Sequence, residues 1–333
     1  MKAVVVHSPG NAEELRVAKV PVPRPGPNQV LVRVQAASVG PIDIGIRSGS
    51  IPAGLPFVIG SDVAGDVILV GAGVTDCSRG DRVLVLSDSI GRTRPGGYAD
   101  YVVVPCADLH PIPDNVSYVS SATVGRPFST AWTALFRDGH MRINQRVAIV
   151  GAADPVGIAA IQICSWKENQ VIAVSNGRHA QRLQAIGATR VVSQSAPNLP
   201  DHVKAGLGGR GASVVVNVLG EGLDVSLEML DLQGRLVVTS GGTPQRLNTR
   251  RMVELLVHVI GSAAAPDAAD VRHIHKLLSE STFLPVIDSI YPLSKAGPAH
   301  RRAASEAVFG AVLLVPDHLY RSAEKVTELF EEE

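Results

Sequence analysis

Short apolar runs separated by turn residues fill roughly the first 115 residues of the chain. Residues 30–34 alternate in polarity, and longer apolar runs cover residues 62–70 and 82–86. Glycine interrupts these runs repeatedly, at Gly60, Gly65, Gly71, Gly73, Gly80, Gly96 and Gly97. Strand-length runs at such spacing are typical of a barrel or sandwich. The pattern therefore predicts a compact β domain.

From about residue 120 onward, apolar strands alternate with helices. The strand-like runs cover residues 147–150, 171–174, 190–192, 213–218 and 235–239, and the helical stretches cover residues 156–167 and 179–186. Near-continuous Val and Ile strands separated by helices are typical of a parallel sheet covered on both faces. About five such units predict a doubly wound α/β domain.

After residue 280 the strand pattern returns, at residues 284–291 and 311–315, with a helix near residues 296–304 between them. We expect these last strands to rejoin the β domain, so that the α/β domain is an insertion. The predicted division assigns residues 1–120 and 282–333 to the β domain and residues 121–281 to the α/β domain. The acidic segment at residues 323–333 is predicted to be a solvated helix end.

Composition narrows the classes of function. The 333 residues suffice for two cores, and 45% hydrophobic with 19% charged residues is typical of a globular chain. Lys plus Arg (31) equals Asp plus Glu (31), so no field favours nucleic acid or a membrane surface. The apolar run before Pro9 is too short for a signal peptide, and no apolar stretch approaches the roughly 18 residues of a spanning helix. We expect a cytoplasmic protein that binds neither nucleic acid nor membrane.

The three cysteines, Cys77, Cys106 and Cys164, lie far apart in the sequence and form no CxxC pair. Structural zinc needs four clustered ligands, and catalytic zinc needs three around an open position. We therefore expect three reduced thiols in or near the core, and no metal site.

A series of short motifs identifies a family. They are Arg47-Ser48-Gly49, Gly60-Ser61-Asp62-Val63-Ala64-Gly65, Gly80-Asp81-Arg82-Val83, Gly96-Gly97-Tyr98-Ala99-Asp100-Tyr101, Thr130-Ala131-Trp132, Gly234-Arg235-Leu236-Val237 and Phe309-Gly310-Ala311-Val312-Leu313. In this order and spacing, the chain resembles the medium-chain dehydrogenase/reductases over nearly its whole length. It is most similar to the zinc-free branch of quinone oxidoreductases (zeta-crystallin) and polyketide enoyl reductases.

The resemblance implies a GroES-like β-barrel domain, a Rossmann domain, a substrate cleft between them and a homodimer. Zinc enzymes of this superfamily carry a cysteine-rich lobe after the GDRV motif, whereas residues 84–96 of this chain contain no cysteine. The resemblance therefore also implies a zinc-independent protein.

The dinucleotide turn of this family resembles A-x-G-G-V-G, whereas this chain has Ala152-Ala153-Asp154-Pro155-Val156-Gly157. The family's glycines let the backbone approach a diphosphate at the start of a helix. A carboxylate at Asp154 would repel that diphosphate by about 1–4 kcal/mol at 4 Å, and Pro155 removes an amide donor. Together the two changes cost several kcal/mol, or about 10²-fold in affinity. As an alternative, Asp is a good N-cap and Pro a good first helical residue, which suits a helix that no longer binds phosphate.

Other family positions lack their usual side chains. Ala180, Gln194 and Ala311 stand where relatives often have a lysine, a tyrosine and a lysine near the cofactor. Gly40 replaces the asparagine of the family's V-N-P-x-D segment, and the substrate-side tyrosines beyond it are missing. One observation favours cofactor binding: the basic residues just after Asn176-Gly177 suit a 2′-phosphate. If NADPH binding is retained, the resemblance places the site at Ala152, Asp154, Pro155, Val156, Gly157, Asn176, Arg178, Arg182 and Gly241.

Candidate substrate residues follow from the same resemblance. Arg126 lies in a segment that is mostly apolar in the family, and a buried arginine needs an anionic partner. It either pairs with Asp43, Asp62 or another carboxylate, or holds an anionic group of the substrate. We therefore list Arg126, Asp43 and Asp62 as candidate catalytic residues. The cleft lining is expected to include Ile44, Ile46, Ile51, Phe128 and Trp132.

Three functions remain open. Because several residues usual at the family's cofactor site are missing, the sequence favours a cofactor-independent cyclase or isomerase. Its expected substrate is an apolar, conjugated, polyketide-like molecule that is possibly anionic. The second is an NADPH-dependent quinone or enoyl reductase. The third is a non-catalytic binder of small molecules.

Overall fold

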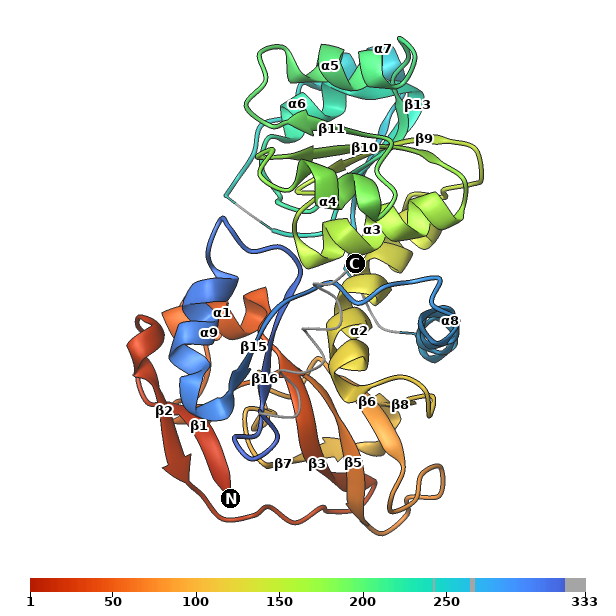
Figure 1. Ribbon diagram of the computed structural model, residues 1–333. Helices are drawn as coiled ribbons and strands as arrows, with labels where there is room; N and C mark the ends of the chain where they lie inside the picture. Colours follow the sequence, from red (N-terminus) through yellow and green to blue (C-terminus); the bar gives the residue numbers. More distant parts are fainter. Residues whose placement is uncertain (242, 264–266, 321–333) are drawn as a thin grey trace. The chain divides into compact units, whose positions relative to one another are not determined.

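The computed structural model describes residues 1–241, 243–263 and 267–320 (Figure 1). Contacts divide the chain into two units. The β unit comprises Met1–Arg126 with the described residues from Val271 onward, and the α/β unit comprises Pro127–Asp270. The division predicted from the sequence places the boundaries at residues 120 and 282 instead. The predicted acidic helix end at residues 323–333 lies outside the described residues.

The β unit contains two sheets. The larger has the order β15-β16-β3-β5-β6-β8, with β7 also paired to β3. Its strands are β3 (Gln29–Ser38), β5 (Asp62–Val70), β6 (Arg82–Leu86), β7 (Tyr101–Pro105), β8 (Leu109–Pro111), β15 (Ile287–Pro292) and β16 (Ala311–Val315). The smaller sheet joins β1 (Lys2–Val6), β2 (Leu15–Lys19) and β4 (Phe57–Val58). Strand β16 pairs with β3 through Leu313 and Ser38, so the last strand does rejoin the β unit.

The β core forms where inward side chains of both sheets meet. Val4, Val32, Val63, Val85 and Tyr98 belong to it, and each is almost fully buried. Because branched aliphatic side chains fit a pleated surface, these Val-rich segments adopt strands although they are short. The helical elements of this unit are η1 (Ala12–Glu14), α1 (Pro41–Ser48), η2 (Cys106–Asp108), η4 (Leu293–Lys295) and α9 (Ala296–Ala303).

The α/β unit is a parallel sheet of order β11-β10-β9-β12-β13-β14. Its strands are β9 (Arg146–Val150), β10 (Gln170–Ser175), β11 (Arg190–Ser193), β12 (Ala212–Asn217), β13 (Leu230–Val238) and β14 (His258–Gly261). The connecting helices are α3 (Pro155–Trp166), α4 (Ala180–Ala185), α5 (Leu199–Gly206), α6 (Leu223–Glu228) and α7 (Thr249–Leu255). Strand order reverses between β9 and β12, which is where ligands bind in doubly wound sheets.

Two helices cross the boundaries between the units. They are α2 (Tyr118–Trp132), followed by the π-helix η3 (Thr133–Asp138), and α8 (Ala268–Ser279). The predicted fold class, a GroES-like β domain with a doubly wound α/β domain, is confirmed by these sheets and by the strand order.

Candidate functional site

The turn after β9 lies at the carboxyl ends of the parallel strands, which we call the dinucleotide edge of the α/β sheet. Gly151 follows β9 with a φ of 84°, a left-handed value that glycine tolerates. Helix α3 then begins at Pro155, with Asp154 as its N-cap. The Val156 amide donates to the Asp154 carboxylate at 2.8 Å. The N-cap and first-turn roles predicted for Asp154 and Pro155 are therefore confirmed.

Gly157 is packed too tightly for any side chain. A Cβ atom at this position would lie 2.4 Å from the carbonyl oxygen of Gly151 and 2.8 Å from the Cα of Ala152. Only glycine lets α3 approach the turn so closely, which is the feature that a dinucleotide site requires at this position. Gly157 therefore allows α3 to pack closely against the turn that precedes it.

Asp154 carries its charge without a cation. Burial raises the pKa of its carboxyl group to about 6, although the hydrogen bond from Val156 lowers it. Among the described residues no lysine or arginine forms an ion pair with this carboxylate. The Val156 amide, which would otherwise face a bound anion, is already occupied. Above pH 6 the turn therefore presents a negative charge where a diphosphate would lie.

The neighbouring strand ends lie at the same edge, since parallel strands end on one side of a sheet. After β10, the Arg178 amide donates to the side chain of Asn176 at 3.1 Å. The side chains of Arg178 and Arg182 are exposed, and Ala180 is the first residue of α4. Gln194 and Gly241 follow β11 and β13. The structure thus brings together every predicted cofactor residue of the α/β unit at one edge, whereas Ala311 lies buried in β16 of the β unit.

Asn217, which the sequence analysis missed, shapes the loop after β12. It is fully buried, and its side-chain oxygen accepts hydrogen bonds from the amides of Leu219 (3.0 Å) and Gly220 (2.9 Å). Its side-chain nitrogen donates to the hydroxyl of Ser226 at 2.9 Å. A Cβ atom on Gly151 would lie 2.9 Å from the Leu219 side chain, so this loop touches the dinucleotide turn. A polar residue that ends an apolar strand was the signal available in the sequence.

In the β unit, Arg126 forms a nearly buried ion pair with Asp62. Its Nε donates to both carboxylate oxygens of Asp62, at 2.7 and 3.0 Å, and its Nη2 donates to the Ser87 carbonyl at 2.9 Å. The two side chains are 17% and 6% exposed. Asp62 raises the pKa of the guanidinium, while burial raises the pKa of Asp62 against the lowering effect of Arg126. The carboxylate pairing expected for Arg126 is confirmed, with Asp62 as its partner.

Asp43 joins two backbone segments of the β unit. Its carboxylate accepts hydrogen bonds from the amides of Gly40 (2.9 Å) and Gly60 (3.0 Å), and the side chain is fully buried. Burial raises its pKa to about 7. These contacts are those of a structural acceptor that ties the start of α1 to the Gly60 turn. The catalytic role predicted for Asp43 gains no support from them.

Tyr98 completes this polar network. Its hydroxyl donates to the Ser38 carbonyl at 3.2 Å. Burial, together with Asp43 and Asp62, raises its pKa well above the ordinary value. The sequence analysis used Tyr98 only as part of a family motif, because nothing in its local pattern shows which carboxylates it faces.

The predicted cleft residues of α1 differ in their positions. Ile46 is 1% exposed and belongs to the β core, so the structure gives no support to its assignment to a cleft lining. Ile46 lies on the inward face of the amphipathic helix α1. The resemblance to the family indicated the segment, but not which face of the helix each residue occupies. Ile44 and Ile51 are half-buried, and Ile51 packs against Gly45.

Two further predicted cleft residues lie in the α/β unit. Phe128 is 3% exposed. The ring of Trp132 packs against Phe136, with centroids 4.5 Å apart, and stacks on Trp166 at 5.8 Å. These contacts place Trp132 in an aromatic cluster, and a role in binding substrate stays a prediction.

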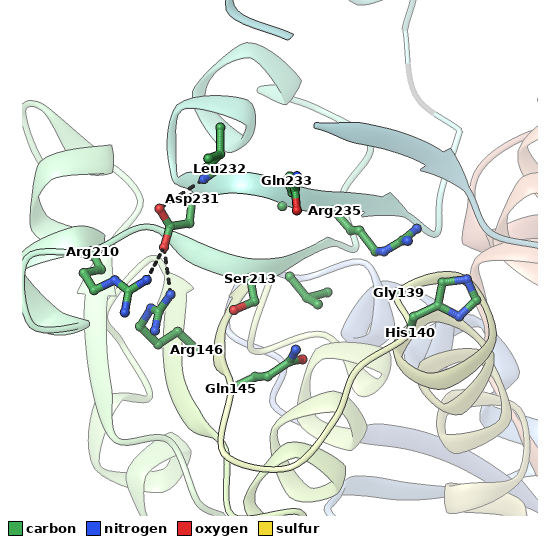
Figure 2. Close-up of a pocket in the computed structure, with 12 residues that line it drawn as sticks. Gly139, His140, Gln145, Arg146, Arg210, Ser213, Asp231, Leu232, Gln233 and Arg235 are labelled. Atoms are coloured by element: carbon green, nitrogen blue, oxygen red, sulfur yellow. Dashed lines mark hydrogen bonds and ion pairs between the residues drawn. The ribbon is translucent and has the colours of Figure 1, made fainter. Parts of the chain in front are cut away.

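A polar hollow of about 220 Å³ lies at the opposite edge of the α/β sheet (Figure 2). Arg146 and Arg210 both donate to one oxygen of Asp231, at 2.8 and 3.4 Å. Ser213, near the start of β12, and Arg235, in the middle of β13, line the same hollow. Because Arg146 and Ser213 lie at the amino-terminal ends of β9 and β12, the hollow is separate from the dinucleotide edge.

Within residues 1–241, 243–263 and 267–320, no three His, Cys, Asp or Glu side chains cluster as metal ligands would. In the same part of the chain, no helix has the length and apolar character needed to cross a membrane.

Comparison with known proteins gives consistent matches. Residues 26–114 match the family model of the alcohol dehydrogenase GroES-like domain, and residues 155–280 match that of the zinc-binding dehydrogenases. The chain is 32% identical to a quinone oxidoreductase of Rattus norvegicus, over 90% of this chain and 93% of the relative.

Solved structures agree with this. An NAD-dependent alcohol dehydrogenase superposes with a TM-score of 0.88 at 31% identity, covering 95% of this chain and 99% of the other. A mycobacterial quinone oxidoreductase gives a TM-score of 0.85 at 26% identity, covering 95% and 100%.

Proposed function

Because the chain belongs to the quinone oxidoreductase-like branch of the medium-chain dehydrogenase/reductase superfamily, we propose that it is an NAD(P)H-dependent reductase of quinones or conjugated enones. The observation that carries this proposal is the similarity to quinone oxidoreductases along nine-tenths of the chain. The cofactor-independent cyclisation that the sequence analysis favours has no support among these relatives. The missing lysine and tyrosine side chains at the cofactor positions are weaker evidence than the similarity to quinone oxidoreductases. The zinc-independent chemistry implied by the resemblance is retained in the proposal.

The residues of the dinucleotide edge fit a nicotinamide cofactor in most respects. The strand order supplies the switch point between β9 and β12, and Gly157 supplies the close approach that a Cβ atom would fill. Arg178 and Arg182 follow β10, where guanidinium groups suit a 2′-phosphate. Asp154 is the exception, because its charge opposes the diphosphate. We infer binding that is weakened but not abolished.

A nicotinamide held at this edge would supply a hydride, and this chain's residues would bind and orient the reactants. The first turn of α3 would hold the diphosphate with the help of the helix dipole, and binding would favour the protonated form of Asp154. The loop that Asn217 fixes keeps the Gly151 turn in place.

We assign to Arg126 the stabilisation of the oxyanion that forms on the substrate carbonyl. Its Nε and Nη2 are committed to Asp62 and Ser87, whereas the contact that its Nη1 makes with the described residues is a long one of 3.4 Å to Asp88, a residue whose side chain is 64% exposed. The Nη1 donors are thus the part of this guanidinium that a substrate can use.

Calorimetric titration with NADPH and consumption of NADPH with 1,4-naphthoquinone test the proposal. We expect Asp154→Asn to tighten NADPH binding about fivefold or more, because the amide keeps the cap but removes at least about 1 kcal/mol of repulsion. Asp201→Asn, at an exposed carboxylate in another helix of the same unit, is the matched control and should change nothing. If neither wild type nor Asp154→Asn binds NADPH or NADH, the proposal is wrong.

A further inference from the structure

Two of the three cysteines, which the sequence places 29 residues apart, meet in the β unit. The sulfur atoms of Cys77 and Cys106 lie 3.6 Å from each other and share a hydrogen bond. Both side chains are half-buried and pack against the β core. Cys164 lies in the α/β unit instead, is fully buried and contacts the sulfur of Met141. The chain therefore holds one dithiol and one isolated thiol.

The two sulfurs lie on turns that the backbone holds side by side. Cys77 is in the connection between β5 and β6, and Cys106 directly follows β7. Asn28 bridges these connections: its carbonyl accepts from the Cys106 amide at 3.0 Å, and its amide donates to the Ala72 carbonyl at 2.9 Å. Closing the sulfur separation to the roughly 2.05 Å of a disulfide needs a shift of about 1.5 Å, which turn residues absorb more readily than strand residues.

We propose that Cys77 and Cys106 form a reversible redox-modification site, a dithiol that peroxides oxidise to an intramolecular disulfide. In the first step the Cys106 thiolate attacks a peroxide oxygen, the O–O bond breaks, and Cys106 sulfenic acid forms. The leaving hydroxide (or alkoxide) takes up the proton that the Cys106 thiol released on ionising, and departs as water (or an alcohol). In the second, the sulfur of Cys77 attacks the Cys106 sulfur, the S–S bond forms, and the S–O bond breaks. The leaving oxygen takes the Cys77 proton and departs as water. The two thiols supply both electrons, and an external dithiol reverses the reaction.

The surroundings of Cys77 assign the order of attack. Cys77 lies in the same connection as the carboxylates of Asp76 and Asp81, and burial, the neighbouring Cys106 sulfur and these negative charges raise the pKa of its thiol above the ordinary value. A thiol that keeps its proton is a poor first nucleophile. Cys106 is therefore the attacking cysteine, and Cys77 the one that resolves the sulfenic acid.

The dithiol lies away from the polar network of the β unit. Asp62 begins β5, while Cys77 follows the end of this strand, so roughly 26 Å of strand separates the two positions. Oxidation is therefore expected to leave the Asp62–Arg126 pair intact. It ties the β5–β6 connection to the end of β7, closing a covalent loop that restricts the unfolded chain.

Intact-mass and thiol measurements on the full-length protein test this proposal. After treatment with hydrogen peroxide and removal of excess oxidant, we expect the loss of two hydrogen atoms, and a fall from three titratable thiols in the denatured protein to one. Proteolytic mapping should find Cys77 linked to Cys106, and dithiothreitol should restore all thiols. The oxidised protein should melt roughly 5–10 °C higher than the reduced one.

Variants separate the site from general oxidation. Cys77→Ser and Cys106→Ser should each lose both the disulfide and the rise in Tm, whereas Cys164→Ala should keep them. Dimedone should trap a sulfenic acid on Cys106 in Cys77→Ser. A disulfide that includes Cys164 or a second chain, or further oxidation of Cys106 in the wild type without a disulfide, would overturn the site. Faster trapping on Cys77 in Cys106→Ser would overturn the order of attack.

Discussion

Asp62 in the β unit and Asp154 in the α/β unit are both carboxylates removed from solvent, but their surroundings differ. Asp62 receives two hydrogen bonds from Arg126, so its charge is balanced by a guanidinium. Asp154 receives one hydrogen bond, from the Val156 amide, and its pKa rises to about 6. Burial raises the pKa of both carboxyl groups, but Arg126 opposes this rise at Asp62, whereas no cation does so at Asp154 among the described residues.

The cation beside Asp62, and the lack of one beside Asp154 among the described residues, indicate what each carboxylate does in its unit. A paired buried charge connects elements, here α2 with β5, and removing one partner of the pair is strongly destabilising. An unpaired carboxylate at a helix start caps the helix but repels any anion that approaches the same amides. In the α/β unit Asp154 therefore stabilises the start of α3 and, under the proposed function, weakens cofactor binding.

The largest expected effect comes from unpairing Asp62. Arg126→Ala leaves a buried carboxylate without its cation, and we expect the β unit to lose about 3–5 kcal/mol in its free energy of unfolding, measured by urea denaturation. The matched control is Arg250→Ala, whose 88% exposed side chain pairs with Glu254 and should change stability by less than about 0.5 kcal/mol. Replacing both Arg126 and Asp62 by leucine should recover most of the loss; equal effects of Arg126→Ala and its control would contradict this account.

A smaller effect is expected at the dinucleotide turn. Gly157→Ala places a Cβ atom 2.4 Å from the Gly151 carbonyl, so helix or turn must shift. We expect a loss of about 1–3 kcal/mol in stability and weaker NADPH binding by calorimetry. Gly261→Ala, where a Cβ atom would meet nothing within 4 Å, should leave both quantities unchanged. Unaltered NADPH affinity in Gly157→Ala would separate this packing from the cofactor.

The smallest effect is the pH dependence that Asp154 confers. Its folded-state pKa of about 6 lies above the ordinary value of 3.8, so the neutral form is favoured in the fold and the charged form predominates above pH 6. We expect the Kd of NAD+ to increase about fivefold from pH 5 to pH 7.5, as the carboxylate begins to repel the diphosphate. The same titration with Asp154→Asn should give a flatter profile, and parallel profiles would rule out this carboxylate as the cause.

Much of the fold was predictable because each strand carries its own signal. The apolar runs at residues 62–70, 82–86 and 311–315 match β5, β6 and β16. Strand β1 was missed, since the apolar residues 3–6 were weighed only as a possible signal peptide. Strand β13 begins at Leu230, whereas the sequence pattern predicted a start at residue 235. The residues before Arg235, including Gln233 with its positive φ, pair irregularly with β12, so they do not show the pattern of a regular strand.

The candidate site was predictable only where the relevant contacts are local. The cap formed by Asp154 and Pro155 involves adjacent residues, and their types alone indicate it. The contact between Cys77 and Cys106 depends on how the segments before β3, between β5 and β6, and after β7 fold together. The 29 residues between the two cysteines in the sequence therefore gave no sign of a pair. The choice of Asp62 as partner of Arg126 was left open for the same reason, since 64 residues separate them.

The place of the α/β unit within the chain has a consequence for biosynthesis. All strands of its parallel sheet lie between residues 146 and 261, so this unit can fold as soon as that contiguous segment leaves the ribosome. The β unit must wait, because β3 near residue 38 receives its partner β16 only after residue 311. We expect the nascent β unit to expose part of the β3 edge during this interval, and to be the later and more aggregation-prone step of folding.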